Sequence, residues 1–273
     1  MRALDQFGNS VQVKHAREAA IRHGRLVVAA KSNNDSSSTQ GEIVVVSVGD
    51  RTLVHSLALP LSLPLTAENE DDNNSGMVAI CCTGIKSDAD WLIRHIQSYI
   101  ADVWCRYDHH TMSTTAMAHW IARLLVSYEQ NDLDEEWQSA TQKRTIKRAS
   151  ASLSRPLGVQ TLFLSSRNES GPQLLLVEPT GRVLTADTSK DLSFLAIGKQ
   201  SDAIKVQLLR SVMEDSASVE QFLVKEILGI LSPSRNEITR LIVETLRQDL
   251  SIERKLIICK NKKVQSSTLL STR

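Results

Sequence analysis

The stretch GNSVQVKHAREAAIRHG, residues 8–24, decides the fold expected for this chain. Asn9 or Ser10 can cap the start of a helix, and Gly24 can end it. The small apolar side chains fall on one stripe at helical spacing and are those of Val13, Ala16, Ala19 and Ala20. Because these side chains are short, the backbone of another element can approach the helix closely on this side. The stretch alone predicts an amphipathic helix near the N-terminus.

The order of residues in this helix resembles the signature helix of proteasome α-type subunits. That signature reads G-R-x-x-Q-V-E-Y-A-x-E-A-x-x-x-G and is followed by a strand and a Lys. The matching residues are Gly8, Gln12, Val13, Ala16, Glu18, Ala19 and Gly24. The strand matches Leu26–Ala30 and the Lys matches Lys31, whereas Lys14 and His15 replace the family's Glu and Tyr.

The composition is that of an ordinary globular protein. The 273 residues suffice for one large domain, and 41% of them are hydrophobic and 23% charged. A net charge of +1 predicts no acidic or basic partner, and only 4% aromatic residues argues against base-stacking surfaces for nucleic acid. We therefore expect no nucleic-acid partner.

The lack of a recognisable signal peptide and the spacing of the cysteines lead us to expect a protein of the cytoplasm and nucleus. Residues 1–25 carry charges throughout, so no signal peptide is expected, and no apolar run reaches the ~20 residues of a membrane span. The four cysteines form no C-x-x-C pair, which is typical of reduced thiols, and they are Cys81, Cys82, Cys105 and Cys259.

The first half of the chain reads as strands followed by paired helices. Apolar, β-branched segments predict strands at residues 26–30, 43–48 and 77–82, with an irregular edge strand within 52–65. Helical periodicity follows from Ser87 to Val103 and from Ser113 to Tyr128. Residues 129–154, acidic and then basic, predict an inserted exposed loop.

The second half changes to short strands and then returns to helices. A meander is expected at residues 159–164, 173–178 and 182–187, with another strand at 194–197. Helices are expected at 201–213, 218–231 and 237–250, a last strand at 256–259, and a frayed polar tail at 260–273. This order predicts one α+β domain with two stacked antiparallel sheets between helix layers.

Four later segments resemble the same family in the same order along the chain. Each is a turn, for which Gly permits special backbone angles and Pro pre-sets a bend. The first is the strand-to-helix turn of Gly84, Ser87, Asp88 and Ala89, and the second is Arg155-Pro156-Leu157-Gly158-Val159. The third is Gly171-Pro172 with Pro179-Thr180-Gly181, and the fourth is Ala196-Ile197-Gly198.

This resemblance implies a fold, an assembly and partners. The fold is the four-layer α-β-β-α sandwich of N-terminal nucleophile hydrolases, and the assembly is the seven-membered α-ring of the proteasome core particle. Its partners are other α-type and β-type subunits, and its role is to support regulated entry of proteins for ubiquitin-dependent degradation. The ring contact is expected on the signature helix, at Gln12, Val13, Ala16, Glu18, Ala19 and Ala20.

Regulatory-particle ATPases are further partners in this family, but the features that serve them differ here. Only seven residues precede Gly8, which is short for a gating tail. The family's docking pocket uses a Lys, and residues 58–65 contain none.

An active peptidase of the same fold is the rival reading, and the sequence argues against it. That chemistry needs a hydroxyl or thiol nucleophile at a freed N-terminus, with a Lys and an Asp nearby. Aligned on Lys31, the nucleophile position holds Arg25 and the Asp position falls at about Gly49, and no Lys lies between Lys31 and Lys86. We therefore expect a subunit with no catalytic residue of its own.

Other chemistry has weaker support. Asp108, His109 and His110 carry metal-binding atoms, but adjacent histidines point in different directions, so neither a metal nor a cofactor is expected. A third reading is a free-standing interaction or assembly protein, a paralogue that is not incorporated in the particle. Its support is the divergence of the sequence from the family pattern.

Overall fold

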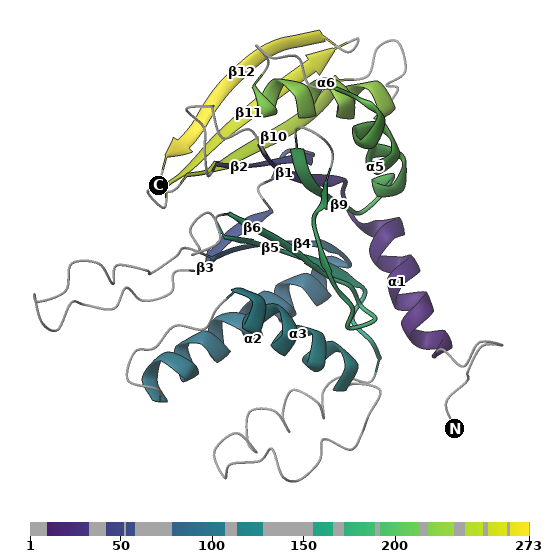
Figure 1. The fold of residues 1–273 in the computed structure, drawn as a ribbon, viewed down its shortest axis with the longest axis vertical. Helices are drawn as coiled ribbons and strands as arrows, with labels where there is room; N and C mark the ends of the chain where they lie inside the picture. Colours follow the sequence, from purple (N-terminus) through teal and green to yellow (C-terminus); the bar gives the residue numbers. More distant parts are fainter. Residues whose placement is uncertain are drawn as a thin grey trace, which may run out of the picture.

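The chain folds as a mixture of helices and strands, with two antiparallel sheets (Figure 1). A computed structural model describes residues 10–32, 42–51, 53–57, 78–106, 114–127, 155–165, 172–188, 192–212, 218–231, 238–247, 251–260 and 263–272. The expected loop at 129–154 lies outside these residues, as do Gly8, Gly171 and the pair His109-His110.

The larger sheet has seven strands in the order β12-β11-β10-β2-β1-β9-β8. Its strands are β1 (Val27–Ser32), β2 (Ile43–Val48), β8 (Asp187–Thr188), β9 (Leu192–Ile197), β10 (Ile238–Leu246), β11 (Ile252–Lys260) and β12 (Lys263–Thr272). At its centre, Val27 of β1 lies opposite Ser47 of β2 on one side and Ile197 of β9 on the other.

The smaller sheet has five strands in the order β3-β4-β5-β6-β7. Its strands are β3 (Val54–Leu57), β4 (Val78–Gly84), β5 (Val159–Ser165), β6 (Gln173–Val177) and β7 (Val183–Thr185). Gly84 at the end of β4 pairs with Val159 at the start of β5. The segments expected at 159–164 and 173–178 therefore form neighbouring strands, as the meander pattern predicted.

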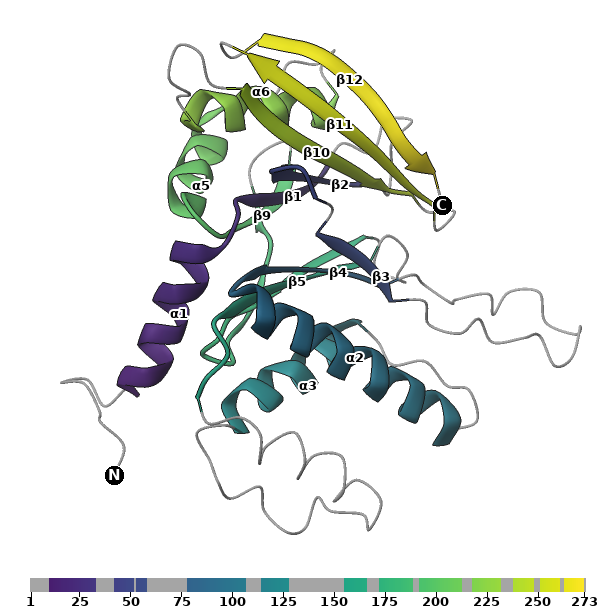
Figure 2. The same ribbon diagram turned by 180° about the vertical axis from the view of Figure 1, so that it is seen from behind.

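Five helices occur among the described residues: α1 (Val11–His23), α2 (Lys86–Arg106), α3 (Thr114–Ser127), α5 (Ser201–Arg210) and α6 (Val219–Leu231). The Ser218 hydroxyl accepts a hydrogen bond from the Gln221 N–H at 3.2 Å and so caps the N-terminus of α6. Seen from both sides, α5 and α6 lie along the larger sheet, and α2 and α3 lie along the smaller one (Figures 1 and 2).

Three apolar clusters explain why the central strands are hydrophobic on both faces. In β2, Val44 and Val46 pack in a cluster that includes side chains of α5 and α6. Ile43 and Val45 belong to a second cluster that includes Leu162 of β5, on the smaller sheet. A third cluster joins the smaller sheet to α2 and α3. Apolar residues at successive positions are thus buried alternately in two different clusters.

Two segments differ from the sequence prediction near the C-terminus. Residues 237–250, expected as a helix, contain β10, which pairs with both β2 and β11 and buries every residue from Leu241 to Leu246. The β-branched residues of this segment favour a strand. Because both faces of the strand are buried, polar and apolar residues do not alternate along it, and the usual sequence pattern of a strand is missing. The tail expected to fray contains β12, which pairs with β11.

Candidate functional site

The end of α1 meets the end of β9 through glycine backbone. The Gly24 N–H donates to the Ala20 carbonyl at 3.0 Å, and the Lys199 N–H donates to the Gly24 carbonyl at 3.1 Å. A Cβ on Gly198 would lie 1.9 Å from the Arg25 carbonyl oxygen, and Gly198 has a positive φ of 84°. Only glycine fits there, because any side chain would collide with the backbone that leaves α1.

A second close contact joins the strand-to-helix turn after β4 to the segment before β5. The Ile85 N–H donates to the Gly158 carbonyl at 2.9 Å. A Cβ on Gly84 would lie 2.2 Å from that same oxygen, and Gly84 has a φ of 135°. The two glycines of these motifs therefore contact each other directly, although they are far apart in the sequence.

The Asp88 side chain also joins the turn after β4 to the segment before β5. Its carboxylate accepts two hydrogen bonds of 2.8 Å from the Arg155 guanidinium and one of 2.9 Å from the Gly158 N–H. The Asp88 side chain is 6% exposed and that of Arg155 is 54% exposed. Burial by itself raises the pKa of Asp88, but the hydrogen bonds and charge of Arg155 and the Gly158 N–H lower it below its ordinary value. The carboxylate is therefore ionised at neutral pH.

Buried polar side chains join these two contacts across the sheets. The Gln160 side-chain oxygen accepts a hydrogen bond from the Gly198 N–H at 3.0 Å, and the Thr83 hydroxyl donates to the Arg25 carbonyl at 2.9 Å. We call the connected set the α1 junction; it consists of Gly24, Arg25, Thr83, Gly84, Asp88, Arg155, Gly158, Gln160 and Gly198. Sequence analysis missed Thr83 and Gln160, whose signal was a polar residue inside an apolar strand.

The Pro179-Thr180-Gly181 turn approaches α1 as well. Arg17 of α1 forms an ion pair of 3.2 Å with Glu178, whose side chain is 7% exposed. Gly181 has a φ of 74°, and a Cβ there would lie 2.1 Å from a methyl carbon of Val126 in α3. This turn is thus bounded by Glu178, which pairs with α1, and by Gly181, which packs against α3.

The small stripe of α1 is packed within its own chain. Ala16 is 7% exposed and Ala20 is fully buried, and the helix contacts β4 and β5. The expectation that these two alanines face a neighbouring chain is therefore wrong, because the chain's own strands occupy that space. Val13 and Ala19 are half-buried, while Gln12 and Glu18 are exposed. The outward face of α1 also carries Lys14, His15, Arg17, Arg22 and His23.

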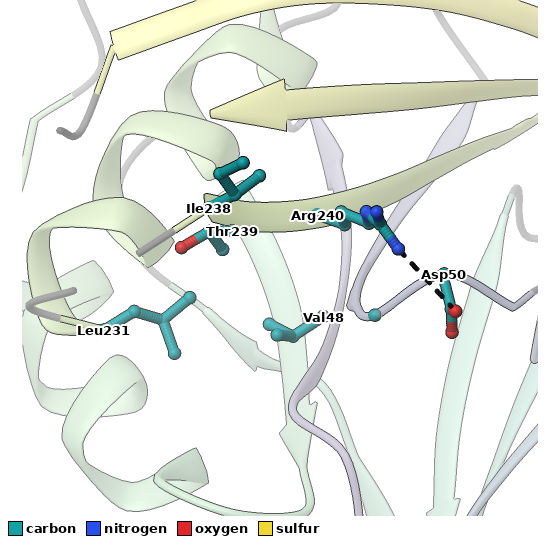
Figure 3. Close-up of a pocket in the computed structure, with 7 residues that line it drawn as sticks. Val48, Asp50, Leu231, Ile238, Thr239 and Arg240 are labelled. Atoms are coloured by element: carbon teal, nitrogen blue, oxygen red, sulfur yellow. Dashed lines mark ion pairs between the residues drawn. The ribbon is translucent and has the colours of Figure 1, made fainter. Parts of the chain in front are cut away.

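Arg25, which follows the end of α1, packs against the turn after β2. Arg25 lies against Gly49, where a Cβ would be 2.7 Å from Arg25 Nη1, and its Nη2 lies 3.9 Å from Asp50. Lys31 donates a hydrogen bond of 2.7 Å to the Pro172 carbonyl. Asp50 also lies 4.0 Å from Arg240 (Figure 3). This pair of arginines around one carboxylate was not anticipated from the sequence.

A shallow pocket of about 390 Å³ opens beside Asp50 and Arg240 (Figure 3). Its lining consists of Val48, Gly49, Asp50, Leu231, Ile238, Thr239 and Arg240. Among the residues that line this pocket, Thr239 carries a hydroxyl group that could serve as a nucleophile. The described lining contains neither a Lys nor a His that could accept the proton of this hydroxyl.

The thiols and histidines offer little chemistry in the described part of the chain. Burial raises the pKa of Cys81 well above its ordinary value and that of Cys82 to about 12, so both remain protonated at neutral pH. His95 is stacked on Trp91, with ring centroids 3.7 Å apart. Within the described ranges, no three His, Cys, Asp or Glu side chains are placed to hold a metal ion.

Comparison with known proteins adds no identification. No protein-family model matches the sequence, and no curated protein matches it either. Of the helices that the structure describes, none combines the length and apolar character that a membrane crossing needs.

Proposed function

We propose that this chain is a non-catalytic α-type subunit of a proteasome core particle. The observation that carries the proposal is the α1 junction. Gly24, Gly84, Gly158 and Gly198 come from four separate motifs that resemble the family, and they meet as two pairs, Gly24 with Gly198 and Gly84 with Gly158, in which the backbones approach closely. The residues that carry the resemblance are therefore those that hold the two sheets and α1 together.

The finer architecture that we propose is the four-layer α-β-β-α sandwich. The three apolar clusters support it, because one includes α5 and α6 with the larger sheet, one includes strands of both sheets, and one includes α2 and α3 with the smaller sheet. The two sheets then form the middle layers, and the helix pairs form the outer ones.

We further propose that the subunit contributes no peptidase activity. Arg25 stands where the nucleophile would be, and its guanidinium lies against Gly49, where the partner carboxylate would be. A guanidinium is a cation at all physiological pH values and cannot act as a nucleophile. The role is then to form the ring, support regulated entry of proteins for ubiquitin-dependent degradation, and contact other α-type and β-type subunits in the cytoplasm and nucleus.

The ring contact that we propose is the exposed face of α1, which replaces the buried alanine stripe. This face carries both charges, including Glu18 and Arg22 one helical turn apart. Its polar character suits an interface between subunits that fold before they associate, because such surfaces must remain soluble in the free chain. Gln12, Val13 and Ala19 adjoin the same face.

The experiment exchanges charges on α1 and follows assembly. A tagged chain is expressed in cells of the organism that produces it and is purified with the chains that bind it. The sample is examined by sedimentation and by mass spectrometry of the co-purifying chains. We expect the unaltered chain to sediment with a very large particle that contains proteasome subunits. The double variant Glu18→Arg with Arg22→Glu should keep its melting temperature and lose that association.

A matched exchange on another helix is the control. Asp202→Lys with Lys205→Glu reverses two charges on α5 and also preserves net charge. Normal assembly of both variants would show that α1 is not the contact. An unaltered chain that carries no proteasome subunits with it would overturn the ring role.

A free-standing interaction protein is the second candidate. The packing of Ala16 and Ala20 against the chain's own strands favours it, because α1 is stable in place without a neighbour. This candidate predicts a small species in sedimentation, with unrelated partner chains. An active threonine-type peptidase has less support, and hydrolysis of fluorogenic peptides by the purified chain would favour it.

A further inference from the structure

One edge of the larger sheet differs from the other three edges of the described structure. The two sheets end in β12, β8, β3 and β7, which are 10, 2, 4 and 3 residues long. Short edge strands protect against pairing with another chain, because they present few free backbone groups. By this criterion β12 is unprotected, and it lies at the outer edge of the sheet in both views (Figures 1 and 2).

The sequence of β12 also lacks the residues that usually protect an edge. Val264–Thr272 contains no charged residue, no Pro and no Gly, and Lys263 at the start is the single charge. The side chains of residues 263–270 are all exposed, and Leu269 is 57% exposed. Among the described residues, β12 pairs with β11 alone.

The centre of β12 is regular enough to accept a further strand. Its pairing with β11 has irregularities between Arg254 and Lys255 and between Ile258 and Cys259. Between them, Ser266, Ser267 and Thr268 lie opposite successive residues of β11. A β-bulge twists an edge away from a partner, but here the irregularities flank the centre and leave it continuous.

We propose that β12 pairs in antiparallel fashion with β12 of a second copy of this chain. Free backbone donors and acceptors along an edge are recognised by another extended strand. Within this regular centre the segment is complementary to itself: a two-fold axis at Ser267 places Ser267 opposite its own copy, and Ser266 opposite Thr268. Hydroxyl pairs directly opposite each other stabilise a sheet.

The single charge of β12 is compatible with a second copy as the occupant. In this register the two Lys263 side chains are separated by about 27 Å along the strands, at ~3.4 Å per residue. That distance exceeds the screening length of about 8 Å at physiological salt, so these two lysines do not oppose the pairing. The proposal concerns β12 and does not depend on the role of α1.

The experiment is a charge-exchange test on the purified full chain. We expect the unaltered chain to show a monomer–dimer equilibrium by sedimentation velocity at concentrations up to about 100 µM. The variants Ser266→Lys with Ser267→Lys and Ser266→Glu with Ser267→Glu each place like charges at the two-fold axis. Each should weaken self-association at least about tenfold, because juxtaposed like charges are strongly unfavourable.

Mixing the two variants is the decisive step. Opposite charges then face each other across the axis, so the mixture should recover the dimer. Ser98→Lys, which adds charge on the exposed face of α2, is the control and should dimerise normally. Both edge variants should melt within about 2 °C of the unaltered chain, because the substituted side chains are exposed.

Three outcomes would overturn the proposal. The first is an unaltered chain that remains monomeric, and the second is a dimer that persists in both charge variants. The third is a mixture that fails to associate although its components are folded. If β12 binds a different chain and two copies of this protein do not dimerise, the unaltered chain remains monomeric and the proposal is overturned.

Discussion

Replacing Asp88 by Asn should destabilise the fold, because this carboxylate holds the α1 junction. It accepts four hydrogen bonds: two from Arg155, one from the Gly158 N–H and one of 3.3 Å from the Ser87 hydroxyl. An Asn oxygen can keep one or two of them, but its NH₂ group then faces a guanidinium that can only donate. The variant therefore loses at least one charge-assisted hydrogen bond and the charge pair.

The expected magnitude follows from the burial of the two partners. A hydrogen bond to a charged group contributes about 1.5–3 kcal/mol. The Arg155 side chain is 54% exposed and can be rehydrated when its partner is lost, which places the loss toward the lower half of that range. We expect a loss of about 2 kcal/mol in the free energy of unfolding, and a fall in melting temperature of about 4–8 °C for a domain of this size.

The pH dependence supplies an independent check on the mechanism. The pKa of Asp88 is lowered in the folded state, so its contribution is complete above the ordinary Asp pKa of about 3.9 and is lost as pH falls through the lowered value. The difference in stability between the unaltered chain and Asp88→Asn should therefore be constant near neutral pH. It should shrink below about pH 4.

Urea unfolding followed by circular dichroism measures both effects, with Asp90→Asn as the control. Asp90 is an exposed carboxylate in the same helix, and its substitution should change stability by less than about 0.5 kcal/mol. Arg155→Lys keeps the charge but removes the two-pronged geometry, so it should lie between the unaltered chain and Asp88→Asn. Equal stability of Asp88→Asn and Asp90→Asn would refute the reasoning.

Three further results are expected. Gly198→Ala should lower the free energy of unfolding by about 2–4 kcal/mol in urea titrations, because its Cβ would collide with the Arg25 carbonyl at a positive φ. Ala20→Leu should cost about 1–3 kcal/mol in the isolated chain, whereas Glu18→Leu on the exposed face should be nearly neutral in the same assay. Cys81 and Cys82 should resist iodoacetamide at pH 8 until the chain is denatured, as peptide mass spectrometry can show, because burial keeps both thiols protonated.

Most strands and helices could be predicted because their apolar patterns report burial. Ile43–Val48 was expected with the bounds that the structure gives, since five of its six residues are buried. β10 was mistaken for a helix because burial on both faces removes the alternation of polar and apolar residues, and Ile238, Leu241, Ile242 and Leu246 fall at helical spacing. β12 gave no alternating apolar pattern, because its described side chains are exposed and its pairing depends on the backbone.

The turns of the α1 junction were visible in the sequence, but their meeting was not. Gly84, Gly158 and Gly198 could be assigned to turns from local chemistry. The bond between Asp88 and Arg155 joins residues 67 positions apart, and no local pattern records such a contact. Only the order of the motifs suggested that they belong to one structure.

The alanine stripe of α1 shows another limit of sequence patterns: they indicate that a face is buried but not which chain covers it. Helical periodicity indicates that one face is buried, but it does not indicate whether the burying surface belongs to the same chain or to another. Ala16 and Ala20 are covered by the chain's own strands, so the surface left for a partner is the charged one that periodicity marks as solvent-facing. If a ring neighbour binds there, its affinity must come from charge and shape complementarity, and it should weaken as salt is raised.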